Sequence, residues 1–131
     1  AGEAWGRVIY YAFTSAVEGV TRFSYKHALE KVVAKVPCIE FRQLSCHNRE
    51  GRLRPDGDCL KTDLDGSSVS NQAPTDGVIL VGRDDLGCYA AGVGFPGIRR
   101  MRFINLGWCN SVEHIGHMIH ETGHALGMEN E

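Results

Sequence analysis

The run His120-Glu121-Thr122-Gly123-His124, followed by Gly127, constrains this chain more than any other feature. On a helix, His120 and His124 lie one turn apart on the same face, where their imidazoles can bind one Zn²⁺. Glu121 then lies beside the metal, where it can take a proton from bound water that attacks a carbonyl. The alternative is an amphipathic helix with two surface histidines, but chance yields the H-E-x-x-H pattern only about 0.02 times at this composition. The run therefore predicts a zinc site.

The third metal ligand is expected three residues after Gly127, because a helix that breaks at a glycine can turn its chain back, as in H-E-x-x-H-x-x-G-x-x-H. That position is Asn130, so the predicted metal ligands are His120, His124 and Asn130. An amide oxygen is a weaker zinc ligand than an imidazole. His117 lies one turn before His120, and we expect it to face solvent or to support a ligand. It is the first substitute to test if Asn130 does not bind.

Composition and charge argue against several kinds of partner. The 131 residues fit one small domain that is long enough for a core of its own. A net charge of −2 gives no electrostatic reason to expect nucleic acid or an anionic membrane surface. No apolar run approaches the roughly 20 residues that a membrane-spanning helix needs. We therefore predict no nucleic-acid partner and no membrane partner.

The five cysteines are an odd number, so they cannot all pair within the chain. They are either reduced cytosolic thiols or a secreted disulfide framework that lacks one partner. Their number beside the zinc motif favours the second interpretation, and with it a secreted or extracellular protein. The unpaired cysteine suggests that the natural chain continues beyond Glu131. A disulfide between Cys46 and Cys59 would tie the polar segment 47–75, which we predict to be a loop insertion.

Hydrophobic periodicity predicts five strands and two helices. β-branched, aromatic or continuous apolar runs indicate the strands, and a 3.6-residue period indicates the helices. Ser24 is the expected N-cap of the first helix, and Pro37 marks its end. The strands are expected at residues 7–13, 38–44, 77–82, 88–93 and 101–106, and the helices at 24–36 and 111–126. This β-α-β unit, followed by further strands and a final helix, predicts an α+β fold.

Gly92, Gly94 and Gly97 spell G-x-G-x-x-G, the pattern of a dinucleotide-binding site. Here Pro96 interrupts the pattern, and the segment that follows has the character of a strand rather than a helix. We therefore expect these glycines to form a turn between two strands.

The motif, the strands and the cysteines together resemble the astacin family of zinc endopeptidases, within the metzincin clan. The similarity runs from near the N-terminus to the last residue, and the metal helix carries it most specifically. Trp5 and the V-I-Y-Y-A-F strand are similar to the family's opening W-x-x-G-x-I-P-Y-x-F, with Tyr10 in place of proline. Further matches are C-I-x-F at 38–41, G-C-x-S-x-V-G from Gly87 onward, a leucine and a cysteine before the metal helix at 106–109, and G-T-I-x-H-E-L-x-H-A-L-G at 116–127.

The resemblance implies a fold and a set of catalytic roles. The fold would be a metzincin-like upper subdomain, with a twisted mixed sheet of about five strands and two long helices, the second carrying the zinc motif. His120 and His124 would bind one catalytic Zn²⁺, and Glu121 would be the general base and proton shuttle. Residues 1–131 would be the upper lobe of an astacin-like peptidase domain, truncated after the zinc helix.

The resemblance also implies disulfides and a substrate surface. Cys88 would pair with Cys109, and Cys38 would pair with a cysteine near the end of a full-length domain, which this chain lacks. A peptide or protein substrate would lie along the edge strand at residues 88–91.

Two functions follow from these features. The first is a zinc-dependent endopeptidase that hydrolyses peptide bonds through a metal-bound water activated by Glu121. The second is a catalytically impaired metzincin-like fragment, or pseudoprotease, that acts as a peptide-binding module. The intact set of His120, Glu121 and His124 favours the first function, whereas Asn130 in place of a third histidine and the missing lower lobe favour the second. A structural protein with an accidental motif is a third alternative.

Overall fold

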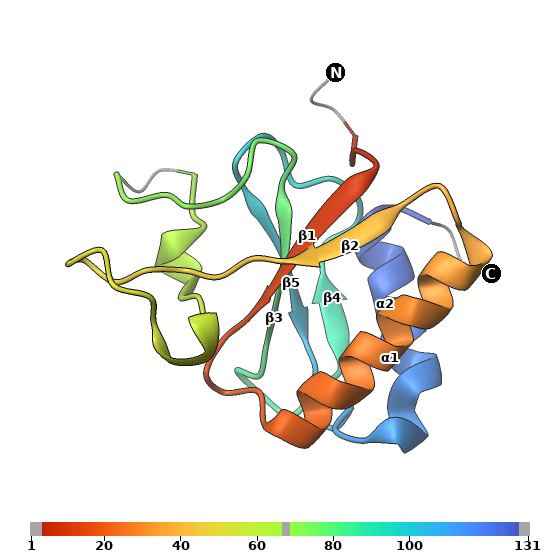
Figure 1. The fold of residues 1–131 in the computed structure, drawn as a ribbon. Helices are drawn as coiled ribbons and strands as arrows, with labels where there is room; N and C mark the ends of the chain where they lie inside the picture. Colours follow the sequence, from red (N-terminus) through yellow and green to blue (C-terminus); the bar gives the residue numbers. More distant parts are fainter. Residues whose placement is uncertain (1–3, 67–68, 129–131) are drawn as a thin grey trace.

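The computed structural model describes residues 4–66 and 69–128, which form one sheet, two α-helices and three 3₁₀ turns (Figure 1). All five predicted strands and both predicted helices are present, and the predicted α+β class is confirmed. The strands are β1 (Val8–Phe13), β2 (Glu40–Gln43), β3 (Val78–Gly82), β4 (Tyr89–Ala91) and β5 (Met101–Asn105). The α-helices are α1 (Gly19–Lys35) and α2 (Ile115–Leu126), and the 3₁₀ turns are η1 (Pro55–Gly57), η2 (Lys61–Asp63) and η3 (Val112–His114).

The five strands form a single mixed sheet in the order β2-β1-β3-β5-β4. The first four strands in this order run parallel, and β4 pairs with β5 in the antiparallel direction. All residues of the central strand β3 are buried, as expected for a parallel strand that is covered on both faces. The two edges of the sheet are β2 and β4, so among the described residues no strand occupies the outer side of β4.

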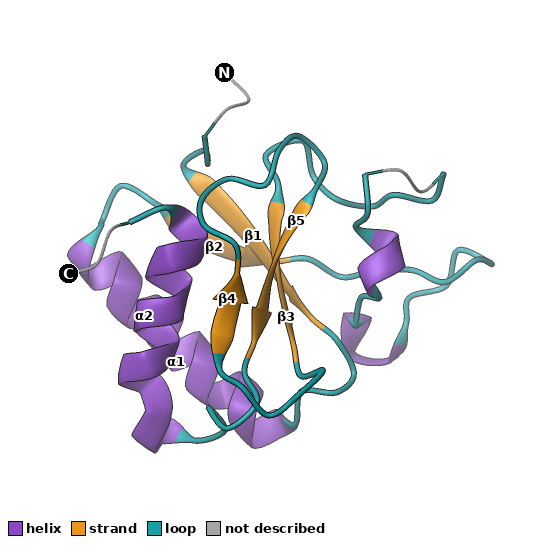
Figure 2. Cartoon of the chain, turned by 180° about the vertical axis from the view of Figure 1, so that it is seen from behind, coloured by secondary structure: helices purple, strands orange, loops and turns teal. Residues whose placement is uncertain are grey.

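Both α-helices cover one face of the sheet, and the segment 47–75 covers the other (Figure 2). Alternate residues of β1 divide between these layers, because successive side chains of a strand point to opposite faces. Ile9 and Phe13 belong to the core beneath the helices, whereas Ala12 belongs to the core beneath the segment. The same alternation divides β3, where Ile79 and Val81 face the helices and Val78 and Leu80 face the segment.

The segment 47–75, predicted as a polar loop, contributes a second core. Leu64, Ala73 and the Cys46–Cys59 disulfide are fully or almost fully buried against the sheet. Two buried residues and a short disulfide-closed loop are too few to give a periodic pattern, which is why the sequence shows none.

Helix α1 begins at Gly19, five residues before the position predicted from Ser24 as N-cap. Ser24 is instead buried inside the helix, where its hydroxyl donates a hydrogen bond to the Val20 carbonyl at 3.0 Å. The prediction was wrong because the first buried positions of this helix, Thr21 and Ser24, are polar. The apolar period therefore starts one turn later than the helix.

The other predicted boundaries of helices and turns agree more closely with the structure. The first helix ends at Lys35, just before Pro37, and the predicted helix 111–126 is the turn η3 followed directly by α2. Gly92, Gly94 and Gly97 form the connection between β4 and β5 with positive φ angles, which confirms the predicted turn. Within the described residues, neither α-helix is long and apolar enough to cross a membrane.

Candidate metal centre on the second helix

His120 and His124 lie one turn apart on α2, with ring centroids 4.5 Å apart and ring planes inclined at 51°. His120 is exposed and His124 is half-buried, so both imidazoles are accessible from the same side of the helix. Among residues 4–66 and 69–128, no cluster of three His, Cys, Asp or Glu donors contains both histidines. Asn130, the predicted third ligand, lies outside the described residues. The described part of the chain therefore brings two of the three predicted ligands together.

Glu121 projects from α2 toward the edge strand β4 and is only 8% exposed. Its Oε1 accepts a hydrogen bond from the Ala90 main-chain N–H at 2.9 Å. Its Oε2 lies 3.2 Å from Nε2 of His117, one turn earlier on the same helix. The carboxylate next to the two metal-ligand candidates is therefore held between the helix and the strand predicted to bind substrate.

His117 is neither a free surface residue nor a neighbour of His124. Its Nε2 lies 3.3 Å from the Cys88 carbonyl oxygen, and its ring packs against Trp108 with centroids 4.7 Å apart. The ring centroids of His117 and His120 are 5.9 Å apart. The structure thus places His117 beside Glu121, the predicted general base, and its predicted role toward a metal ligand stays a prediction.

Helix α2 is joined to α1 by a buried hydrogen bond that sequence analysis missed. The hydroxyls of Tyr25 and Thr122 are 2.9 Å apart, and both side chains are completely buried. Burial raises the pKa of the Tyr25 hydroxyl, although the hydrogen bond with Thr122 acts in the opposite direction. The available signal was Thr122 itself, because the resembling family has leucine at this position. A threonine between two buried positions of an apolar helix face requires a polar partner.

The C-terminal end of α2, which carries His124, is fixed by three separate contacts. Gly127 caps the helix in the left-handed conformation at φ 85°, as expected for a glycine that follows a helix. The Gly94 N–H donates to the His124 carbonyl at 3.0 Å, and the Trp5 indole N–H donates to the Ala125 carbonyl at 2.9 Å. Carbonyls that would otherwise lack partners at the helix end are therefore satisfied by distant segments.

The glycine turn between β4 and β5 is itself held by Arg102. The Arg102 guanidinium donates hydrogen bonds to the carbonyls of Gly94, Ala91 and Val93, at 2.9, 3.2 and 3.3 Å respectively. Gly92 allows this close approach, because a Cβ at that position would lie 2.2 Å from Nη1 of Arg102. The G-x-G-x-x-G run therefore supports α2 through Gly94, a structural role that does not involve a nucleotide.

Two disulfides are present, and both were expected. Cys88 pairs with Cys109, which links the start of β4 to the segment before α2, as the family resemblance implied. Cys46 pairs with Cys59 on the opposite face of the sheet. Cys38 is exposed and free, and its pairing with a further cysteine stays a prediction.

Comparison with known proteins shows the fold. No protein-family model and no curated protein matches the sequence. Among solved structures, the chain is similar to "High choriolytic enzyme 1 (HCE-1), a hatching enzyme zinc-protease" from the medaka fish Oryzias latipes, with a TM-score of 0.61 and 19% sequence identity. The match covers 98% of this chain and 50% of that protein. The chain thus has the fold of about half of an astacin-family zinc protease, as its motifs predicted.

Proposed function

We propose that this chain supplies the zinc-binding helix, the general base and the substrate-binding edge of a zinc-dependent endopeptidase. One observation carries the proposal: Glu121, adjacent to the paired imidazoles of His120 and His124, is hydrogen-bonded to the main chain of the edge strand at Ala90. A helix that merely carried surface histidines would have no reason to bury a carboxylate against the edge strand of the sheet.

The residues present fit a zinc ion in part. Catalytic zinc sites use three protein ligands and leave one position open, and neutral imidazole is a common ligand. His120 and His124 supply two nitrogens, and Asn130 is the proposed third ligand; His117, the predicted substitute, lies against Glu121 and Cys88 instead. When bound, zinc would polarise the substrate carbonyl and lower the pKa of water.

Glu121 is the proposed acid–base group of the reaction. In peptide hydrolysis it would take a proton from the attacking water and pass that proton to the leaving amine. Its present hydrogen bond to Ala90 supports this role, because a peptide that pairs with β4 would place its own main chain beside the carboxylate. The proposed substrate is therefore an extended peptide or protein segment along residues 88–91.

The two disulfides support a protein that is exported to an oxidising compartment, because such bonds do not persist in the reducing cytosol of most cells. We accordingly propose a secreted or extracellular location.

The alternative function is a peptide-binding module without catalysis. It is favoured by the number of ligands, since the described residues bring only two metal-ligand candidates together. Such a module would still use the open side of β4 to pair with a peptide.

Zinc binding tests the metal site first. Calorimetric titration at neutral pH should give one equivalent of zinc, and His124→Ala should weaken binding by at least about 100-fold, because even outer-sphere changes cost 10–100-fold. His27→Ala is the matched control, since His27 is an exposed histidine on α1 and should leave the affinity unchanged. Equal affinities for wild type and His124→Ala would refute the site.

An assay of peptide hydrolysis then distinguishes the peptidase from the peptide-binding module. If the chain is a peptidase, Glu121→Gln should still bind zinc but cleave a peptide library at least about 100-fold more slowly than wild type. If wild type binds peptides without cleaving any of them, while Glu121→Gln binds them equally well, the module interpretation is correct.

A further inference from the structure

We propose that Cys88, Cys109 and His117 form a second metal site, one that opens only when the Cys88–Cys109 disulfide is reduced. The two sulfur atoms and a ring nitrogen of His117 all lie within 4.8 Å of one another. Two thiolates and one imidazole are a donor set that selects Zn²⁺ and similar borderline-soft divalent cations. This site requires neither His120 nor His124 and does not rest on the proposed peptidase activity.

The surroundings of His117 suit a metal ligand. Its Nε2 lies 3.3 Å from the Cys88 carbonyl oxygen and 3.2 Å from Glu121, so a metal bound at this nitrogen would replace both contacts. Trp108 packs on the imidazole and restricts its orientation. The His117 side chain is 37% exposed, whereas Cys88 is 8% exposed and Cys109 is completely buried. Solvent therefore reaches the cluster from the histidine side, which gives an ion a path of entry.

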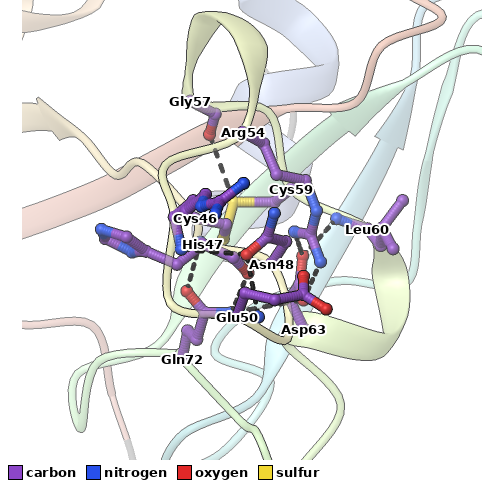
Figure 3. Close-up of polar contacts among 11 residues, drawn as sticks. Cys46, His47, Asn48, Glu50, Arg54, Gly57, Cys59, Leu60, Asp63 and Gln72 are labelled. Carbon is purple, nitrogen blue, oxygen red and sulfur yellow. Dashed lines mark hydrogen bonds and ion pairs between the residues drawn. A yellow bond between two sulfur atoms is a disulfide. The ribbon is translucent and has the colours of Figure 1, made fainter.

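The second disulfide shows why proximity alone is insufficient. Cys46, Cys59 and Asp63 also lie within 4.8 Å of one another. Both carboxylate oxygens of Asp63, however, are engaged by the Arg54 guanidinium, and Oδ2 also accepts from the Leu60 N–H (Figure 3). A metal at Asp63 would leave the half-buried Arg54 cation without its partner, which is strongly unfavourable. The Cys46–Cys59 pair is therefore an internal control, because it should bind no metal even after reduction.

The chemistry of opening the site is a thiol–disulfide exchange. A low-molecular-weight thiol attacks the more accessible sulfur, Cys88, and forms a mixed disulfide while Cys109 leaves as the thiolate. A second molecule of thiol releases Cys88, so two thiols are oxidised to one external disulfide and the two cysteines gain two electrons. Binding of Zn²⁺ then requires both cysteines as thiolates, and any protons on them pass to solvent. The fourth tetrahedral position stays open to solvent.

Cobalt(II) is the probe for this site, because a thiolate ligand gives a charge-transfer band in the near ultraviolet that imidazole and carboxylate ligands do not. The background is Cys38→Ser, which removes the one free thiol. The protein is reduced, freed of reductant without oxygen, and titrated with Co²⁺. The reduced chain should show the thiolate band with one equivalent of metal, and the oxidised chain should show none.

Three variants in the Cys38→Ser background locate the ligands. Cys88→Ser/Cys109→Ser should abolish the band, whereas Cys46→Ser/Cys59→Ser should leave it intact. His117→Gln should weaken Co²⁺ binding by at least about 100-fold, because loss of a direct ligand exceeds the 10–100-fold cost of outer-sphere changes.

Several results would overturn the proposal. These are a reduced, folded chain without the band, a band that persists in Cys88→Ser/Cys109→Ser, and unchanged affinity in His117→Gln. If reduction unfolds the chain, metal must restore its helical circular dichroism, because binding energy at such a site is folding energy. Failure to restore that signal contradicts the site. Loss of zinc binding at His120 and His124 would give no change in the thiolate band, so the two proposals fail independently.

Discussion

One buried pair of hydroxyl groups fixes the position of α2 on α1. The Tyr25–Thr122 pair is completely buried, and its two hydroxyls satisfy each other across the contact between the two helices. An unsatisfied hydroxyl in this place costs more than the hydrogen bond contributes, because the group has lost water without gaining a partner. The pair therefore specifies how α2 sits on α1, and through that contact where His120 and His124 lie.

We expect Tyr25→Phe to lower the free energy of unfolding by about 1–3 kcal/mol, because it leaves the Thr122 hydroxyl buried without this partner. The double variant Tyr25→Phe/Thr122→Val should be less destabilised than the sum of the two single variants, since both polar groups are then removed. Urea denaturation of the four proteins measures this coupling. Strictly additive effects would contradict the contact.

The same tyrosine gives the stability a dependence on alkaline pH. Because burial raises the folded-state pKa of Tyr25 above its ordinary value of about 10, its contribution is complete below pH 10 and is lost as the pH rises further. Tyr11, whose pKa is also raised by burial, contributes in the same direction. Tyr25→Phe should therefore show a smaller loss of stability above pH 10 than wild type does.

At the scale of secondary-structure elements, the glycine turn after β4 connects this edge strand to α2, the helix that carries His120 and His124. Arg102 binds three carbonyls of this turn, and the turn in turn donates the Gly94 N–H to the last part of α2. The guanidinium is partly withdrawn from water where it makes these bonds, and this burial lowers the pKa of Arg102. The glycine turn and Arg102 therefore fix the position of the edge strand β4 relative to helix α2.

Arg102→Ala should lower the free energy of unfolding by about 1–3 kcal/mol, because the partly buried Gly94 carbonyl and two exposed carbonyls lose a charged donor. It should also weaken zinc binding, since the support for His124 is lost. Arg100→Ala is the matched control, because Arg100 is an exposed arginine in the same connection, just before β5. Its removal should change the free energy of unfolding by no more than about 0.5 kcal/mol. Urea unfolding and zinc titration of both variants provide the measurement, and identical behaviour of the two would exclude the supporting role.

These elements also show what a sequence can and cannot predict. The strands and the helix that carries His120 could be predicted, because hydrophobic period and residue type report on local structure. The start of α1 could not be predicted from its period, since its first buried positions are Thr21 and Ser24. The Glu121–Ala90 bond could not be predicted either, because it joins residues 31 positions apart and depends on which strand forms the edge of the sheet.

On the scale of the whole molecule, the sheet separates two hydrophobic cores that support different parts of the chain. The core beneath α1 and α2 positions the metal-ligand candidates, whereas the core on the other face is built from the segment 47–75. This segment is held together by the Arg54–Asp63 ion pair and the Cys46–Cys59 disulfide. A second ion pair, Arg22–Asp58, joins it to helix α1. The second face is thus a structural layer, remote from the candidate metal centre.

Loss of that layer's disulfide should therefore affect stability and not metal binding. Cys46→Ser/Cys59→Ser should lower the free energy of unfolding by about 3 kcal/mol, as expected for a disulfide that closes a short loop. Its zinc affinity should equal that of wild type, as measured by titration under conditions in which the variant stays folded. Cys38→Ser, which removes an exposed free thiol, serves as the control for both measurements. A parallel loss of zinc affinity would show that the two cores are coupled through the sheet.

The long-range contacts of α2 have a consequence for the order in which this protein is made. Trp5 binds Ala125 across 120 positions, and Tyr25 binds Thr122 across 97 positions. Contacts between such distant residues form late, because the entropy of closing a long loop must be overcome before they stabilise anything. During synthesis from the N-terminus, the helix that carries His120 and His124 leaves the ribosome after every element on which it packs. The candidate metal centre therefore forms after the sheet beneath it, and a nascent chain has no such site until that sheet is complete.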